Sequence, residues 1–237
     1  MIFQSDAKFY FPKTVPTIEG DTLNVEELAA KYNLILLTLK APGCPICPHL
    51  LILLNFLGLN SASTEGTLED PFERTRICIS KEDLKFNRTL LRTDSYFLVL
   101  CPGSVSQLVE LRENTNFREH SFILDTELTL SRSIGLCMAT SHIWPAILHI
   151  QPYTLKISPI KFGREAGFYG HHSLISFLSA TRFEAEVRSL RTIYHADKMM
   201  DNLGKLVERT PIFVTKSFIL PIEILDRMFK YLDFATL

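Results

Sequence analysis

Two uninterrupted apolar runs, residues 34–39 and 96–101, stand out in the first half of the chain. Neither run alternates apolar with polar positions, which is typical of strands that are covered on both faces in a parallel sheet. Before the first run, apolar residues recur at intervals of three and four from Val25 to Tyr32, as they do on one face of a helix. The pattern therefore predicts buried strands that alternate with helices.

Capping residues mark where several of these helices begin. Asn24 with Glu27, and Ser104 with Gln107, have the spacing of a capping box, in which two side chains bond free N–H groups at the helix start. Asp125 follows a third apolar run and predicts the start of another short helix. Strand and helix thus repeat with short connections.

The order of the predicted elements defines the fold class. A repeat of strand and helix with short connections implies a parallel sheet with helices on both faces. A later strand at 146–150 and a return strand at 153–157 are separated by a turn, so this last pair is antiparallel. We therefore expect an α/β protein with a central mixed sheet flanked by helices.

Two regions depart from this repeat. Residues 60–94 are polar, with one short strand candidate at 76–80, and we interpret them as an insertion. From Phe183 onwards the pattern is helical alone. We predict a first domain over residues 1–180, a helical connector over 181–216 and a distinct segment over 217–237.

Composition and charge argue against several classes of partner. The 237 residues include 25 basic and 26 acidic side chains, a net charge of −1, which gives no electrostatic reason to expect nucleic acid or an anionic membrane surface. The longest apolar stretch, 50–59, is shorter than the ~18–20 residues that a membrane span needs. The N-terminus shows no secretory signal, so we expect a cytoplasmic protein.

Five cysteines, an odd number with one close pair, argue against a secreted disulfide framework. The close pair, Cys44 and Cys47, lies between the first buried strand and the next apolar run, where a helix N-terminus would stabilise a thiolate. We predict thiol–disulfide exchange, with Cys44 as the attacking thiolate at the helix start and Cys47 as the resolving thiol one turn in. Cys78, Cys101 and Cys137 are expected to be buried apolar residues.

Two other interpretations of the close pair stay open. One is a structural zinc site, although such a site needs four ligands and the sequence has no second close pair of cysteines. The other is an inert pair. We expect neither a metal nor a cofactor.

The residues around the pair resemble those of a known superfamily. Residues 40–47 resemble the active-site strand end and Cys-x-x-Cys motif of the thioredoxin superfamily. Residues 97–104, and later 122–127 with 134–136, look like the elements that follow the active site in its peroxiredoxin (AhpC/TSA) branch. The resemblance spans residues 20–180. It implies a thioredoxin-like fold with a helical C-terminal extension, and thiol–disulfide oxidoreductase or peroxiredoxin-like antioxidant activity.

The same resemblance implies further site residues. Gly43 and Pro45 flank Cys44, and Trp144 with Pro145 precedes a late strand, so these four residues are expected to bind substrate. Thioredoxin-like proteins place a cis-proline at the position of Pro145, and a trans-proline is the alternative. The implied partner is a thiol or disulfide protein substrate or reductant. The chain departs from the thioredoxin pattern at Thr38, where that family has a buried aspartate.

A second resemblance lies at the C-terminal end. Residues 218–225, continued by 228–237, resemble the start of an F-box, and about half of that motif is present. The resemblance implies binding to the Skp-type adaptor of a cullin ubiquitin ligase. The residues expected to bind it are Phe218, Leu220, Pro221, Ile224, Leu225 and Leu232. The alternative function is therefore a non-catalytic adaptor that links a client to the ligase, and the structural alternative is an amphipathic helix that packs on its own domain.

Overall fold

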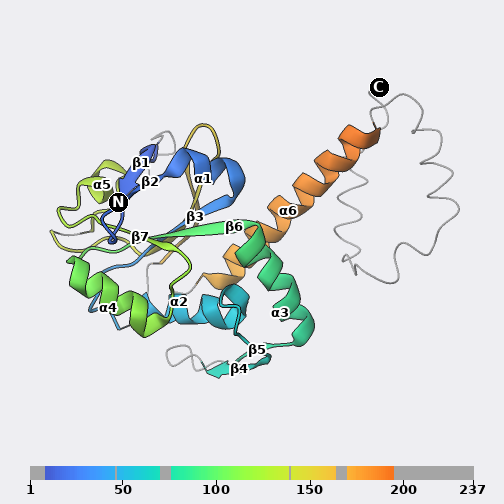
Figure 1. Ribbon diagram of the computed structural model, residues 1–237, viewed down its shortest axis with the longest axis horizontal. Coiled ribbons are helices and arrows are strands. Elements are labelled where there is room, and N and C mark those ends of the chain that lie inside the picture. The colour runs from blue at the N-terminus through green and yellow to red at the C-terminus, as the bar shows by residue number, and fades with distance from the viewer. Residues whose placement is uncertain (1–8, 46, 70–75, 139, 164–169, 195–237) are drawn as a thin grey trace, which may run out of the picture. The chain divides into compact units, whose positions relative to one another are not determined.

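The computed structural model describes residues 9–45, 47–69, 76–138, 140–163 and 170–194 (Figure 1), the last eight of them by backbone alone. The chain divides into two compact units, residues 1–183 and 184–237, and the second is described over residues 184–194 as part of the last helix. Of the helices in these ranges, none is long and apolar enough to cross a membrane. In chain order the elements, of which η1 and η2 are π-helical turns, are β1 (Thr14–Pro16), β2 (Thr22–Asn24), α1 (Val25–Lys31), β3 (Asn33–Thr38), α2 (Cys47–Leu54), η1 (Asn55–Leu59), β4 (Gly66–Glu69), β5 (Arg76–Ile79), α3 (Lys81–Arg88), η2 (Thr89–Thr93), β6 (Ser95–Leu100), α4 (Val105–Thr115), β7 (Ser121–Ile123), α5 (Thr129–Ser133), β8 (Ala146–Ile150), β9 (Ile157–Phe162) and α6 (His171–Tyr194).

Five strands form the central sheet, in the order β7-β6-β3-β8-β9. β3 is parallel to β6, and β6 to β7, whereas β8 runs antiparallel to both β3 and β9. Every residue of β3 after the first is buried, as its unbroken apolar run predicts. The predicted central mixed sheet with flanking helices is confirmed.

The return strand lies later in the chain than predicted. β9 covers Ile157–Phe162 rather than 153–157, because the turn after β8 is longer than the sequence pattern suggests. Tyr153 and Leu155 have backbone φ angles of 64° and 53° in this turn. These angles belong to the left-handed region, which a strand does not use.

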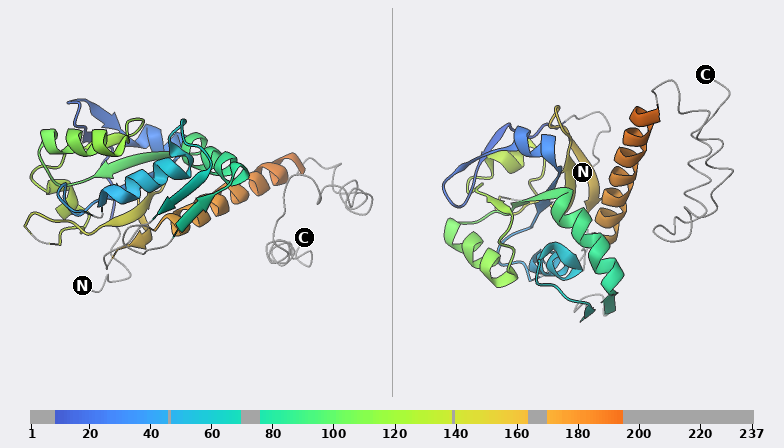
Figure 2. Two further views of the ribbon diagram at one scale, coloured as in Figure 1. Left: turned by 90° about the horizontal axis from the view of Figure 1, so that it is seen from below. Right: turned by 45° about the vertical axis from the view of Figure 1, so that its right-hand side comes forward.

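Alternate residues of the sheet belong to two separate cores. One core lies under α2, α3 and α4 and takes Ile35, Leu37 and Leu39 from the β3 segment; we call it the α2 core. The other lies under α1 and α5 and takes Leu34 and Leu36; we call it the α1 core. Figure 1 and the right-hand view of Figure 2 show these two groups of helices on opposite faces of the sheet. Because successive side chains of a strand point to opposite faces of the sheet, odd-numbered residues of the β3 segment join the α2 core and even-numbered residues join the α1 core.

Helix caps hold α4 and α1 where the sequence predicts them. The Ser104 hydroxyl accepts from the N–H of Gln107, whose side chain accepts from the N–H of Ser104, so this capping box is complete. The Asn24 side chain accepts from the N–H of Glu27 at 3.2 Å. The Glu27 carboxylate pairs with Lys31 at 2.6 Å instead of closing the second box, because Lys31 lies one turn along the same helix.

Residues 60–94 carry more regular structure than predicted. They contain the β4–β5 hairpin, α3 and η2, where the sequence pattern predicts one short strand. α3 begins at a complete capping box formed by Ser80 and Asp83, and its Leu84 is buried in the α2 core. Because Asp stands where the usual signature has Glu or Gln, that signature does not identify this start. Cys78 of β5 is exposed, so the expectation of a buried residue is wrong there.

α6 begins at His171, earlier than the predicted start at Phe183. Its first turns are held by Leu174 and Leu178, which are fully buried in the α2 core. These two residues already have helical spacing in the sequence. The predicted start lies too far along the chain because it was placed at the first long apolar stripe, which belongs to a later part of the same helix.

Candidate redox site

The predicted catalytic cysteines follow the carboxyl end of the central strand. Thr38, the last residue of β3, is paired with Leu100 of parallel β6 and with Ala146 of antiparallel β8. Three connecting segments therefore meet at this edge of the sheet: the loop from Lys40 to α2, the loop after Leu100 and the segment before Ala146. In open α/β sheets, sites gather at the carboxyl ends of the strands in this way.

Cys44 and Cys47 differ in their exposure to solvent. The Cys44 side chain is half-buried at the border of the α2 core, whereas Cys47 is 7% exposed and lies within it. The Cys44 N–H donates to the carbonyl of Ala41 at 3.1 Å and closes a turn. The Lys40 N–H donates to Cys47 Sγ at 3.2 Å. Solvent thus reaches the first thiol, and the second is enclosed.

The helix begins later, relative to the pair, than predicted. Cys47 is the first described residue of α2, so it is not one turn in, and Cys44 lies in the preceding turn rather than at the helix start. The prolines explain this, because Pro45 disfavours helical backbone at Cys44, the residue before it. Pro48 occupies the first turn of α2, where its missing N–H has no intrahelical partner to lose.

Burial raises the pKa of the Cys47 thiol to about 12. A hydrogen bond between the two thiols and a charge on Cys44 raise this pKa further, while the backbone N–H groups of Lys40 and Ala41 act in the opposite direction. Two of the three causes that raise the pKa therefore depend on Cys44. Near neutral pH, Cys47 therefore keeps its proton, chiefly because it is buried.

Thr38 is fully buried but does not face the cysteines. By alternation its side chain lies on the same face as those of Leu36 and Ala146, which belong to the α1 core. Its hydroxyl donates to the carbonyl of Trp144 at 2.6 Å. At the position where thioredoxins carry an aspartate, this chain thus has a threonine whose hydrogen bond joins β3 to the segment before β8.

Trp144 and Pro145 lie in that segment, and both are half-buried. The Ile143 N–H donates to the carbonyl of Lys40 at 3.3 Å, which ties the segment to the loop of the cysteines. None of the described peptide bonds is cis, so the cis form implied for Pro145 is wrong. The trans bond is the lower-energy form, and in it the Trp144 carbonyl accepts the hydroxyl of Thr38.

Gly43 and Pro45, on either side of Cys44, are exposed. Their exposure leaves the backbone around the accessible thiol open to another molecule. The part that Gly43, Pro45, Trp144 and Pro145 take in substrate binding stays a prediction.

The prediction of site residues left out a third thiol. Cys101 directly follows β6 and is fully buried in the α2 core together with Cys47, so its expected burial is confirmed. Gly103 lies against the ring of Pro42, where a Cβ would come within 2.6 Å of the ring. The sequence holds a signal for this placement, because residues at the ends of neighbouring parallel strands share one edge of a sheet. Cys137, in contrast, is only half-buried.

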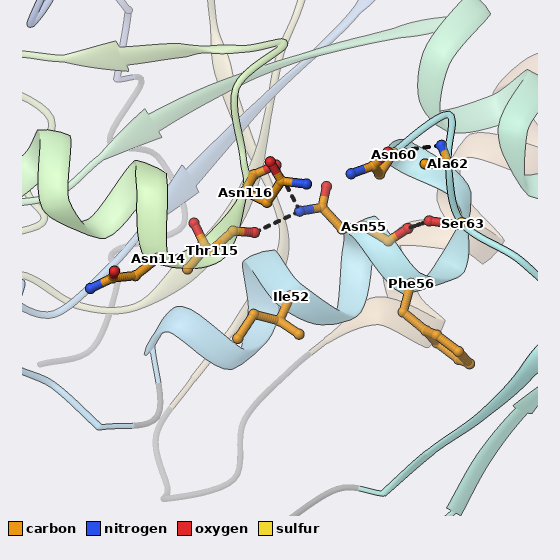
Figure 3. A pocket seen from close by; sticks show the side chains of 9 residues that line it. All are labelled: Ile52, Asn55, Phe56, Asn60, Ala62, Ser63, Asn114, Thr115 and Asn116. Carbon is orange, nitrogen blue, oxygen red and sulfur yellow. Dashed lines mark hydrogen bonds between the residues drawn. The ribbon is translucent and has the colours of Figure 1, made fainter.

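A separate hollow of about 400 Å³ lies at the C-terminal end of α2 (Figure 3). Asn55 donates to the carbonyl groups of Thr115 and Asn116 at 2.8 and 3.1 Å, and the Ser63 hydroxyl donates to the carbonyl of Asn55. Neither Cys44 nor Cys47 is among its lining residues, which are Ile52, Asn55, Phe56, Asn60, Ala62, Ser63, Asn114, Thr115 and Asn116. Its hydrogen bonds join η1 to the end of α4 and to Ser63.

The predicted adaptor-binding residues cannot be placed in this way. Residues 195–237 lie outside the described part of the chain, so adaptor binding stays a prediction for Phe218, Leu220, Pro221, Ile224, Leu225 and Leu232. Within the described ranges, no group of three or more His, Cys, Asp and Glu side chains is arranged to hold a metal ion.

The sheet and its flanking helices define a thioredoxin-like fold, as similarity to solved structures shows. A peroxiredoxin Q of Xanthomonas campestris has a TM-score of 0.50 and 11% identity, over 74% of this chain and 99% of that one. Peroxidoxin BcpB of Mycobacterium tuberculosis has a TM-score of 0.49 and 9% identity, over 73% and 98%. A secreted disulfide oxidoreductase of the same organism, homologous to E. coli DsbE, has a TM-score of 0.43 and 10% identity, over 69% and 94%. Similarity at this identity shows the fold alone. No family model and no curated protein matches the chain.

Proposed function

We propose that this chain is a thiol–disulfide oxidoreductase that uses Cys44 and Cys47. The observation that carries the proposal is the contrast between a half-exposed Cys44 and an enclosed, protonated Cys47 in contact with it. An oxidised substrate has access to the first thiol only. The Cys47 thiol is placed to attack a disulfide that forms between Cys44 and the substrate.

The reaction proceeds in two exchange steps. The Cys44 thiolate attacks one sulfur of a substrate disulfide, so that a Cys44–substrate disulfide forms and the other substrate sulfur leaves as a thiolate. Cys47 then loses its proton and attacks the Cys44 sulfur. The Cys44–Cys47 disulfide forms, the bound substrate sulfur leaves as a thiolate, and two electrons have passed from the pair to the substrate.

The raised pKa of Cys47 gives this order of events a physical basis. While Cys44 is free, its hydrogen bond and its charge both help to keep Cys47 protonated. A mixed disulfide on Cys44 removes that charge, so the pKa of Cys47 falls when its thiolate is needed. Burial, the largest cause, remains and protects Cys47 from other oxidants.

The accessible surface around Cys44 favours a protein disulfide as substrate. Gly43 and Pro45 are exposed on either side of it, and the 143–145 segment is tied to the same loop through Lys40. Such a surface offers backbone groups to an extended peptide. The pair would cycle in a reducing compartment, as we expect for a cytoplasmic protein.

Disulfide exchange fits this site better than peroxide reduction at Cys47. The species that attacks a peroxide is the thiolate, and the pKa of about 12 keeps Cys47 protonated at neutral pH. An antioxidant role of the chain would therefore act through disulfide reduction at Cys44.

Reduction of insulin disulfides, with dithiothreitol as the electron donor, tests the proposal. Cys44→Ser should lower the rate on the order of 100-fold or more, because the attacking sulfur is lost. Cys47→Ser should leave the first step intact and, when it is reduced beforehand and mixed with insulin without dithiothreitol, accumulate a covalent complex with the substrate. The matched control is Cys78→Ser, which removes an exposed thiol on the β4–β5 hairpin and should change neither result.

Two outcomes would contradict the proposal. One is a Cys44→Ser protein that keeps the wild-type rate. The other is a pre-reduced Cys47→Ser protein that traps no mixed disulfide with insulin in the absence of dithiothreitol, under conditions in which the pre-reduced wild-type protein is oxidised by insulin.

A further inference from the structure

Cys101 is a buried thiol that the two-cysteine mechanism does not use. It continues the alternation of Phe97 and Val99 along β6, and all three side chains lie in the α2 core. Cys47, at the first turn of the helix that covers this face, lies in the same core. Cys101 has no exposed surface, so any reaction it undergoes must be with a group inside the protein.

The backbone on both sides of Cys101 is fastened to the segment that carries the pair. Before it, the Leu100 carbonyl accepts from the N–H of Leu39 at 2.9 Å. After it, Gly103 packs against Pro42 so closely that a Cβ would lie 2.6 Å from the proline ring, and its φ of 154° also favours glycine. The segment that carries Cys101 is therefore held against the segment that carries the pair.

The electrostatic environment of the three sulfurs agrees with this placement. Burial raises the pKa of Cys101 above its usual range, and charges on Cys47 and then on Cys44 raise it further. Cys47 has the larger effect of the two, as expected if it is the nearer sulfur. The hydrogen bond of Cys101 itself is weak, to the carbonyl of Pro102 at 3.6 Å.

We propose that Cys101 is a third redox thiol of the same site, which exchanges with the oxidised pair inside the protein. The Cys101 sulfur attacks the Cys47 sulfur of the Cys44–Cys47 disulfide. A Cys47–Cys101 bond forms, the Cys44–Cys47 bond breaks, and the proton that Cys101 loses ends on Cys44. The step is an isomerisation without net oxidation, so it needs no further oxidant or reductant. It rests on the proposed function, which supplies the first disulfide.

The exchange gives the oxidised protein a second state. The disulfide becomes enclosed in the α2 core, where external thiols do not reach it, and Cys44 returns to the surface as a free thiol. In this state the protein keeps one disulfide, between Cys47 and Cys101, while the free Cys44 can still form a mixed disulfide with another substrate. The three thiols do not suggest a metal site instead, because no metal-binding arrangement is found among the described residues.

The sequence makes the two disulfides easy to distinguish. Trypsin cleaves after Lys40, Arg74, Arg92 and Arg112, so Cys44 and Cys47 share peptide 41–74, while Cys101 lies in peptide 93–112. The first disulfide is therefore internal to one peptide, and the second joins two peptides. The full chain is oxidised with glutathione disulfide, its free thiols are blocked with N-ethylmaleimide in acid, and the digest is read by mass spectrometry.

Wild-type protein should give both the internal disulfide and the 41–74/93–112 linked pair, with part of Cys44 blocked by the maleimide. Cys44→Ser should give neither product, because the oxidant reaches the two buried thiols only through Cys44. Cys101→Ala should lose the linked pair and the blocked Cys44, and keep the internal disulfide. The matched control, Cys137→Ala, removes a half-buried thiol of the α1 core border and should change neither product.

Failure of this inference can be told apart from failure of the proposed function. If the internal disulfide forms and turns over, but no linked pair appears in the wild-type protein, then Cys101 is only a packing residue. If the internal disulfide is missing even in folded Cys101→Ala and insulin is not reduced, then the proposed function is wrong and the inference falls with it.

Discussion

A buried carboxylate beside the α1 core and the buried thiols of the α2 core differ in how fully they are hydrogen-bonded. Beside the α1 core, the buried Asp125 carboxylate accepts from the N–H groups of Leu130 and Ser131 and from the Ser131 hydroxyl, at 2.6 to 3.0 Å. In the α2 core, the shortest backbone hydrogen bond to Cys47 is 3.2 Å, from the N–H of Lys40, and Cys101 has a weak bond of 3.6 Å to the carbonyl of Pro102.

The difference in hydrogen bonding suggests a structural role for Asp125 and leaves the buried thiols available for chemistry. A buried group with all its hydrogen bonds made is held in place, and it stabilises the turn that it bonds. Buried thiols that adjoin one another have few such bonds, and the bond open to them is a disulfide. The α2 core thus surrounds the thiols of the proposed redox site, whereas the predicted catalytic cysteines make no part of the α1 core.

The largest expected effect comes from a matched pair of substitutions on β3. Leu37 and Leu36 are neighbours, both fully buried, and they face the α2 and the α1 core respectively. Leu37→Ala and Leu36→Ala should each lower the free energy of unfolding by about 2–5 kcal/mol, through lost burial and the cavity left behind. Urea denaturation monitored by circular dichroism measures this cost.

Only the substitution in the α2 core should also change the thiols. Burial is the largest cause of the raised pKa of Cys47, so a cavity that admits water at Leu37 should lower that pKa. The rate of alkylation against pH, in a Cys44→Ser background, reports it. Equal alkylation profiles for the two leucine variants would show that the cores do not differ in this respect.

The second prediction concerns alkaline pH. The Cys47 thiol has a pKa of about 12 in the folded protein against 9.0 without the fold, so the unfolded chain loses this proton first as pH rises. The stability linked to the group is complete below pH 9 and is lost between about pH 9 and 12, at up to about 1.4 kcal/mol for each pH unit. Urea denaturation of the reduced protein at a series of pH values measures the slope.

Cys47→Ala should make that slope shallower, because it removes one of the two buried thiols whose pKa the fold raises; Cys101 is the other. Oxidation of Cys47 to a disulfide should have the same effect, because a disulfide sulfur has no proton to release. Cys137→Ala is the matched control on the other face and should leave the slope unchanged. A slope that is as steep in Cys47→Ala as in the wild-type protein would assign the alkaline loss of stability to groups other than Cys47.

The sequence was sufficient for the elements that rest on local rules. The unbroken runs of β3 and β6 predicted buried parallel strands, and Ser104 with Gln107 predicted the start of α4. Chain order then led to the central mixed sheet. Cys44 and Cys47 were predicted as the site because they are close in sequence, and the structure places both after the end of β3.

What the sequence did not supply depends on contacts between distant segments. Cys101 reaches the pair only through the pairing of β6 with β3 and the approach of Gly103 to Pro42. Thr38 faces away from Cys47 because alternation puts it on the α1-core face, which a motif comparison does not register. The isomer of Pro145 likewise depends on its surroundings and not on the residue alone.

The smallest expected effect compares the caps of the two helices, one for each core. Ser104 makes a complete capping box with Gln107 at the start of α4, while Asn24 makes only one cap bond, to the N–H of Glu27, at the start of α1. Ser104→Ala and Asn24→Ala should each lower the free energy of unfolding by about 0.5–2 kcal/mol. Ser104→Ala should lower it more, because it also frees the Gln107 side chain that closes the box.

Since α4 covers the α2 core, Ser104→Ala has a second readout. It should leave insulin reduction unchanged at 25 °C, because the cap is exposed and its loss opens no path to Cys47. A fall in that rate without loss of folded protein would mean that the caps, and not only the packed leucines, isolate the thiols from solvent.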